Sequence, residues 1–109
     1  MSTVVPGTVY VAVIPYEDRT GEARRPVVLI GSPSYWQPDA RRLVCPITTA
    51  APRPADIALD WQALGLRSPS CVRPRPVIIP KSDIRFEVGH LAADDLEALQ
   101  AALRDVLGL

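Results

Sequence analysis

Apolar residues in the first half of the chain occur in short runs that polar segments separate. Runs rich in β-branched and aromatic residues at 8–14 (TVYVAVI), 26–30 (PVVLI) and 42–49 (RLVCPITT) predict three strands. The polar segment 16–25 and the segment 31–40, which holds two prolines and a glycine, have no apolar periodicity. We therefore expect both segments to be exposed loops between strands.

The second half of the chain predicts shorter strands. A proline-rich segment at 50–56 is expected to be a loop, and the runs that follow predict strands at 57–60, 70–73 and 76–79. Proline cannot donate a hydrogen bond to a sheet, so Pro74 and Pro76 restrict the last two strands to an edge or a bend. Six short strands with long loops predict a small, strongly curved barrel.

The end of the chain has a different periodicity. Between residues 92 and 107 the apolar positions follow helical spacing, at Leu96, Leu99, Leu103, Val106 and Leu107. Acidic residues occupy the first turn, where the helix dipole favours them, and Gly108 provides a stop. We expect this apolar stripe to cover the barrel and to serve stability.

Length and composition set further limits. A chain of 109 residues predicts a single domain that spans residues 1–109. No apolar run reaches the roughly 18 residues of a spanning helix, and the first residues lack a basic segment before an apolar one, so we expect a cytoplasmic protein with no membrane contact. Cys45 and Cys71 form no Cys-x-x-Cys or Cys/His pattern, which predicts two buried thiols and no metal site.

Charge is unevenly distributed although the net charge is zero. Residues 1–18 carry a net charge of −2, and residues 82–109 carry −4. Residues 19–81 hold ten basic and four acidic residues, which gives +6. Arginine supplies eleven of the twelve basic residues, and its planar fork suits phosphate. The middle of the chain could bind a polyanion, although high arginine content also fits a GC-rich genome.

Five segments in order resemble the MazF/PemK family of toxins from bacterial toxin-antitoxin pairs. They are GTVYVAVIP (7–15), RRPVVLI (24–30), VCPITT (44–49), GLRSPSCVR (65–73) and VGHLAADDLEAL (88–99). The resemblance covers nearly the whole chain. It implies a mostly β fold with a C-terminal helix, described as a small SH3-like barrel. It also implies a homodimer that cuts single-stranded RNA without a metal or cofactor and that a cognate antitoxin silences.

The same resemblance implies a set of site residues. By matching position, the arginine of the Arg-Pro pair is Arg25, and the threonine after Pro-Ile is Thr48. Both can donate hydrogen bonds to a phosphate whose charge rises in the transition state. Arg73, in the Val-Arg step, matches a site arginine of some members. The residues expected to contact RNA are Arg24, Thr49, Arg73, Arg75 and Trp36, the last being an alternative contact for the antitoxin.

The proton acceptor is the open question in this set. Arginine stays protonated and is a poor base, so a carboxylate or histidine is expected nearby. Many family members have Glu or His about five residues before the Arg-Pro arginine, where this chain has Thr20. Several members also have aspartate where this chain has Arg75. Glu22 is the first candidate base, followed by Glu17 and Asp18, and a solvated loop acid is the alternative.

His90, the single histidine, lies before the terminal helix, and a structural role is expected for it.

Two further functions remain open. Gyrase-poisoning toxins share this barrel but grip their target with aromatic residues at the end of the helix, whereas this chain ends Asp-Val-Leu-Gly-Leu. The other alternative is a catalytically silent relative that only binds antitoxin or RNA.

Overall fold

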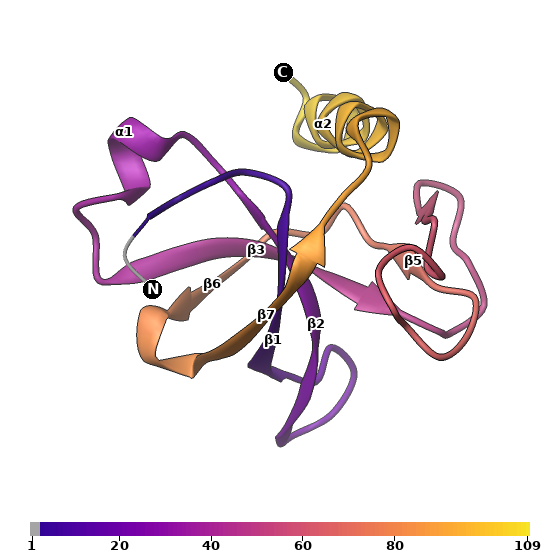
Figure 1. Cartoon of the computed structure of the whole chain (residues 1–109), viewed down its shortest axis with the longest axis horizontal. Helices are drawn as coiled ribbons and strands as arrows, with labels where there is room; N and C mark the ends of the chain where they lie inside the picture. The colour runs from indigo at the N-terminus through magenta and orange to yellow at the C-terminus, as the bar shows by residue number, and fades with distance from the viewer. Residues whose placement is uncertain (1–2) are drawn as a thin grey trace.

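The computed structural model describes residues 3–109, which form one bent sheet with a helix across one side (Figure 1). The strands are β1 (Thr8–Pro15), β2 (Glu22–Ile30), β3 (Arg41–Thr48), β4 (Ile57–Ala58), β5 (Cys71–Val72), β6 (Val77–Pro80) and β7 (Ile84–His90). The helices are α1 (Pro33–Trp36), the 3-10 turn η1 (Lys81–Asp83) and α2 (Ala93–Leu107). Neighbouring strands follow the order β4-β5-β3-β2-β1-β7, and every pairing is antiparallel.

The expected mostly β fold with a C-terminal helix is confirmed, but the sheet is a barrel only in a loose sense. One edge of β3 is shared, since β6 pairs with Arg41–Val44 and β5 pairs with Ile47–Thr48. Although β6 and β7 are joined by η1, β6 pairs with β3 and β7 pairs with β1. The sheet is therefore not closed.

Two strand predictions need correction. Segment 16–25 was expected to be a loop, yet β2 begins at Glu22 and pairs with β1 from Pro15↔Glu22 to Val9↔Val28. The first residues of β2 are polar, so apolar patterning could not reveal them. The strand β7 was not predicted, although its apolar residues Ile84, Phe86 and Val88 alternate with Arg85, Glu87 and Gly89 as in a strand with one buried face. It pairs only with β1, with two register shifts, as expected of an edge strand.

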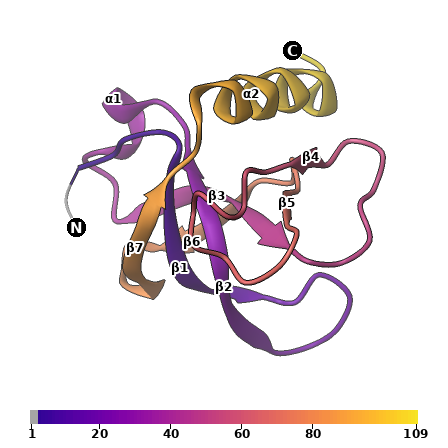
Figure 2. The same cartoon turned by 45° about the vertical axis from the view of Figure 1, so that its right-hand side comes forward.

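The core lies in two layers, one on each face of the sheet. Adjacent residues of β2 alternate between them, because successive side chains of a strand point to opposite faces. Val28 and Ile30 pack under α2 with its Leu99 and Leu103, while Val27 packs in the second layer. Figure 2 shows α2 lying across the sheet, with β4 and β5 on one side of it.

The helix prediction is confirmed with one correction. Leu99 and Leu103 are buried, and Gly108 ends α2 in the left-handed conformation with φ of 73°. Val106 and Leu107 were expected on the covering stripe but are about half exposed, at 50% and 54%. Burial of the stripe therefore ends one turn before the helix does. Within residues 3–109, no helix has the length and apolar character needed to cross a membrane.

Arg42 is a fully buried arginine that anchors the segment before β3. Its Nη1 donates hydrogen bonds to the carbonyl oxygens of Trp36, Asp39 and Arg41 at 2.8–2.9 Å. The carbonyl groups at the end of α1 and in the following turn thereby gain a donor. Residues 33–36 were expected in an irregular loop and instead form this one-turn helix. Arg42 contributes nothing to the basic surface that the sequence suggested.

Both cysteines are buried free thiols, as predicted. Burial raises the pKa of the Cys45 thiol to about 12, so it stays protonated at neutral pH. Burial also raises the pKa of Cys71, and the nearby Asp56 carboxylate adds to this effect. Neither thiol is therefore activated as a nucleophile.

Candidate functional site

Arg25 and Thr48 lie just beyond the paired residues of β2 and β3. The β2–β3 ladder runs from Ile30↔Leu43 to Val27↔Pro46, and each of the two residues lies two positions past the last pair. Because side chains alternate along a strand, both point to the face that Val27 and Pro46 share. The structure thus brings together the two residues that the resemblance selected as phosphate donors.

Both residues border a groove with a volume of about 670 Å³. Apolar residues of the four strands β1, β2, β3 and β7 line one part of it, and residues of the segment 65–70 complete the lining. Thr49, Arg67 and Ser68 add polar groups to the same lining. None of the residues that line this groove is acidic or a histidine. The groove therefore offers donors for an anion and an apolar surface, and its own lining provides no carboxylate.

The two donors differ in how they are held. Thr48 Oγ1 accepts a hydrogen bond from the backbone N–H of Ala50 at 3.1 Å, which leaves the hydroxyl hydrogen available to another acceptor. The Arg25 guanidinium carbon lies 5.7 Å from the centre of the Tyr16 ring. Among the ion pairs of residues 3–109, none includes Arg25. Its fork can therefore receive an external anion.

Arg73, expected to contact RNA, forms an internal ion pair. It donates to the Asp56 carboxylate from Nε at 3.2 Å and from Nη2 at 2.9 Å. Both side chains are largely buried, Asp56 being only 1% exposed. Burial raises the pKa of Asp56, but hydrogen bonds from Arg73 and from the Arg53 backbone outweigh it, so the pKa is lower than usual. Asp56 is thus a fixed anion that orients Arg73.

A second carboxylate gathers three arginines. Glu17, in the β1–β2 connection, forms ion pairs with Arg53, Arg73 and Arg75. The hydrogen bond from Arg53 is the main cause that lowers the pKa of Glu17, and attraction to Arg75 adds to it. We call Glu17, Arg53, Asp56, Arg73 and Arg75 the Glu17 cluster. It joins the β1–β2 connection to the segments before β4 and after β5.

The Glu17 cluster lies on the same face of the sheet as Arg25 and Thr48. Thr48 pairs with Cys71 of β5, so these two residues point to the same face as Arg25. Arg73 N donates to the Pro46 carbonyl at 2.9 Å, which places Arg73 in the next row on that face. Figure 2 shows the β1–β2 connection reaching toward the side that holds β5.

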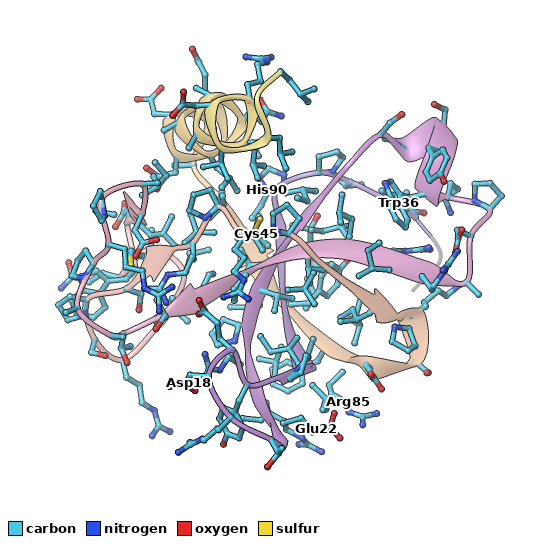
Figure 3. All side chains as sticks on the ribbon, turned by 180° about the vertical axis from the view of Figure 1, so that it is seen from behind. Asp18, Glu22, Trp36, Cys45, Arg85 and His90 are labelled. Atoms are coloured by element: carbon cyan, nitrogen blue, oxygen red, sulfur yellow. The ribbon has the colours of Figure 1, made fainter. Side chains whose placement is uncertain are left out.

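The candidate bases are less well placed. Glu22 and Arg25 are three residues apart on a regular strand, so their side chains leave opposite faces of the sheet. Figure 3 shows Glu22 at the end of the β1–β2 hairpin and Asp18 in its connection. Glu17 is held as an anion with a lowered pKa, which makes it a weak base. The structure does not bring Glu22 into the groove.

The remaining predicted residues are dispersed. Thr49 borders the groove, whereas Arg24 leaves the face of β2 opposite Arg25. Trp36 is half-buried against the second core layer and stacks edge-to-face with Tyr35. Figure 3 shows Trp36 well away from Asp18 and Glu22. Trp36 is therefore not part of this groove.

His90 is held by backbone carbonyl groups outside the groove. Its Nδ1 lies 2.8 Å from the Leu91 oxygen, and its Nε2 lies 3.0 Å from the Pro6 oxygen. The ring also covers Gly7, which has φ of 93° and no space for a side chain. These contacts give His90 a role in joining the N-terminal segment to the end of β7. Within residues 3–109, no group of His, Cys, Asp or Glu is arranged to hold a metal ion.

Sequence reasoning missed the anionic partners of the arginines. Glu17 and Asp56 are 39 positions apart, and no motif connects them. The β4–β5 ladder brings Asp56 to Arg73, and the β1–β2 connection brings Glu17 to the same arginine. Arg53, in the proline-rich segment, was likewise counted only as basic charge. The one available signal in the sequence was Asp56, an acid that follows the Arg53-Pro54 step in a loop, and this signal is weak.

Comparison with known proteins decides the family. A model of the PemK-like, MazF-like toxins of type II toxin-antitoxin systems matches residues 6–107. The chain belongs to this toxin family. No curated protein gives a significant sequence match to it.

Solved structures of toxins share the fold of this family member. It is similar to the Mycobacterium tuberculosis toxin MazF-mt6, with 26% identity, a TM-score of 0.74, and coverage of 94% of this chain and 97% of that one. A mycobacterial endoribonuclease in complex with its cognate antitoxin gives 16% identity, a TM-score of 0.77, and coverage of 96% and 95%. A MazE-MazF structure from Deinococcus radiodurans gives 20% identity, a TM-score of 0.76, and coverage of 100% and 99%.

Proposed function

We propose that this chain is a sequence-selective endoribonuclease that cuts single-stranded RNA, mRNA included, in the cytoplasm without a metal ion. The observation that carries this proposal is that Arg25 and Thr48, just beyond the paired residues of β2 and β3, border one groove with further hydroxyl and guanidinium groups. Membership of a toxin family and the likeness to a mycobacterial endoribonuclease support the same activity.

In the proposed reaction, the ribose 2′-oxygen attacks the adjacent phosphorus as its proton is removed. The bond from phosphorus to the 5′-oxygen breaks, and that oxygen takes up a proton, which leaves a 2′,3′-cyclic phosphate. Arg25 donates hydrogen bonds to the phosphate oxygens as their charge increases, and the Thr48 hydroxyl donates another. The two protein donors perform the charge stabilisation that a metal ion gives in other nucleases.

The RNA chain follows the groove from this pair. Thr49 borders the groove and can contact the backbone, while Arg24 extends the positive charge to the opposite face of β2. Glu22 remains the first acid to test as the base, although its strand position directs it away from Arg25. A change in the β1–β2 connection when RNA binds is needed for a carboxylate to reach the 2′-hydroxyl.

We also propose that the protein works as a homodimer and is inhibited by a cognate antitoxin. The edge strand β7 and the half-exposed Phe86 and Ile78 leave sheet and apolar surface to cover. Structural relatives include a toxin in complex with its cognate antitoxin. An acidic, extended antitoxin segment would compete with RNA for the arginines of the middle of the chain.

One observation favours a second function, that of a catalytically silent relative which binds antitoxin or RNA only. No acid or histidine is among the residues that line the groove, so the lining contains no proton acceptor. A toxin that grips gyrase with an aromatic helix end is less favoured, because α2 ends in leucine and glycine.

Expression in a bacterium separates these functions. The chain is induced alone and together with the upstream reading frame, and RNA 5′ ends are mapped after growth stops. If the chain is an endoribonuclease, new 5′ ends should appear at one short recurring sequence. These ends should disappear when the antitoxin is present. Growth arrest without new RNA ends would contradict the cleavage proposal and support a binding toxin.

A further inference from the structure

The Glu17 carboxylate occupies a position where three guanidinium groups meet. Arg53 comes from the segment before β4, while Arg73 and Arg75 follow β5. Arg73 is fixed by Asp56, so its Nη1 is directed at Glu17 at 3.4 Å. The side chains of Arg53 and Arg75 are 57% and 56% exposed, which leaves this meeting point open to solvent.

The charge balance of the cluster suits exchange of one anion for another. Three arginines against Glu17 and Asp56 give a net charge of +1, and the cluster would carry +2 without Glu17. A phosphodiester has one negative charge and two free oxygens, as a carboxylate does, and arginine forks bind both geometries. A backbone phosphate could therefore take the place of the Glu17 carboxylate and leave the net charge unchanged.

The segment that carries Glu17 is closed into a compact turn that also touches the candidate site. Tyr16 N donates to the Gly21 carbonyl at 3.0 Å, and Gly21 adopts φ of 97°, which favours glycine. Arg19 lies 4.1 Å above the centre of the Tyr16 ring, and Arg25 faces the same ring at 5.7 Å. Displacement of Glu17 would therefore be felt at Arg25.

We propose that Glu17 is an internal substitute for an RNA phosphate, which fills a subsite formed by Arg53, Arg73 and Arg75 until RNA displaces it. This inference rests on the proposed action on RNA and adds a self-inhibiting contact to it. Displacement frees the 16–21 turn, whose Tyr16 ring faces Arg25. RNA binding and rearrangement of the site then become one event.

The position of the cluster favours an RNA backbone over an acidic peptide. Neighbouring strands are about 4.8 Å apart, so β5 lies about 10 Å from β2 on the face shared with Arg25. A chain with phosphates at regular intervals can place one at Arg25 and another at the cluster. Two fixed arginine positions on one sheet face match such a repeated anion.

The test measures binding and does not require cleavage. A short 2′-O-methyl RNA, which lacks the attacking hydroxyl, is titrated against the wild type and Glu17→Gln by fluorescence anisotropy. Glu17→Gln lacks the competing carboxylate, so we expect it to bind the RNA about three- to tenfold more tightly. The gain is no larger because exposed ion pairs are individually weak. Asp18→Asn removes the same charge from the same turn and takes part in no ion pair of residues 3–109, so a change below about twofold is expected.

A second variant keeps the inference testable if Glu17→Gln is poorly folded. Arg53 is exposed, so Arg53→Gln should fold normally while it weakens binding of the same RNA. Because each lost phosphate contact removes about 0.7 from the slope of log affinity against log salt for single strands, the slope should become shallower by about that amount. An unchanged slope, or Glu17→Gln binding no tighter than wild type, would overturn the proposed subsite.

The same titrations separate this inference from the proposed cleavage. If Glu17→Gln tightens RNA binding while no RNA is ever cut, the subsite stands and the nuclease proposal fails. If RNA is cut but Glu17→Gln does not bind more tightly, only the subsite fails. A poly-glutamate peptide is titrated in parallel. If Glu17→Gln binds the peptide more tightly than wild type does but binds the RNA equally well, the cluster is a site for an acidic protein partner and the RNA subsite is overturned.

Discussion

Arg73 holds the buried carboxylate of Asp56 by two hydrogen bonds, from Nε at 3.2 Å and from Nη2 at 2.9 Å. The pair extends the β4–β5 ladder by one position, since Ile57 pairs with Val72 next to it. Removal of one partner leaves a buried charge without compensation, which is more costly than loss of an exposed ion pair. The residue that resembles a site arginine is thus also a structural one.

Asp56→Ala is expected to lower the free energy of unfolding by about 3 kcal/mol, because Arg73 then keeps a largely buried charge with only Glu17 nearby. Urea denaturation followed by circular dichroism measures the change. Asp39→Ala is the matched control, since its partner Arg41 is well exposed, and it should cost much less. Equal losses in the two variants would contradict the structural role of Asp56.

Acid should weaken the fold through the same cluster. The pKa values of Glu17 and Asp56 are lowered in the folded chain, so the unfolded chain binds more protons in acid. Their contribution is complete above the unfolded pKa values of about 4 and is lost as pH falls through the folded ones. Unfolding free energies measured from pH 6 to pH 3 should fall less steeply in Asp56→Asn than in the wild type. If the unfolding free energies of Asp56→Asn and the wild type fall equally from pH 6 to pH 3, Asp56 does not contribute to the acid dependence.

Arg42 should be indispensable for stability although it lies in the basic part of the chain. Arg42→Ala removes three hydrogen bonds to carbonyl groups and opens a cavity, so a loss of about 2–4 kcal/mol is expected. Arg42→Met fills most of the volume without burying a charge, so it should cost less than alanine. Thermal unfolding of both variants checks the order. If Arg42→Ala melts at the wild-type temperature, the three hydrogen bonds of Arg42 do not stabilise the fold.

Much of the fold could be predicted from local patterns. The strands β1 and β3 follow from continuous β-branched runs, and α2 follows from helical spacing with an acidic first turn and Gly108. The start of β2 could not be predicted, because pairing with β1 stabilises its polar residues in a strand. The strand β7 was missed although its apolar residues alternate with polar ones, which is a local signal for a strand.

The site could be predicted only in part, and for a related reason. Arg25 and Thr48 were proposed from the resemblance, and the β2–β3 ladder explains why residues 23 positions apart border the same groove. The partners of Arg73 and the burial of Arg42 depend on contacts between distant segments that no spacing reveals. Charge along the chain therefore overstated the basic surface, because four of the ten basic residues in the middle are buried or held in the Glu17 cluster.

We propose that Arg25 and Thr48 stabilise the transition state of RNA cleavage. Purified wild type, Arg25→Ala, Thr48→Ala and the control His90→Ala are compared on one RNA substrate in the presence of EDTA, with the 3′ products analysed. We expect cleavage by wild type and His90→Ala, 2′,3′-cyclic phosphate ends, and a loss of about 100- to 1000-fold in rate for each site variant. Cleavage by Arg25→Ala at the wild-type rate, or arrest of wild-type cleavage by EDTA, would contradict this role of Arg25 and Thr48.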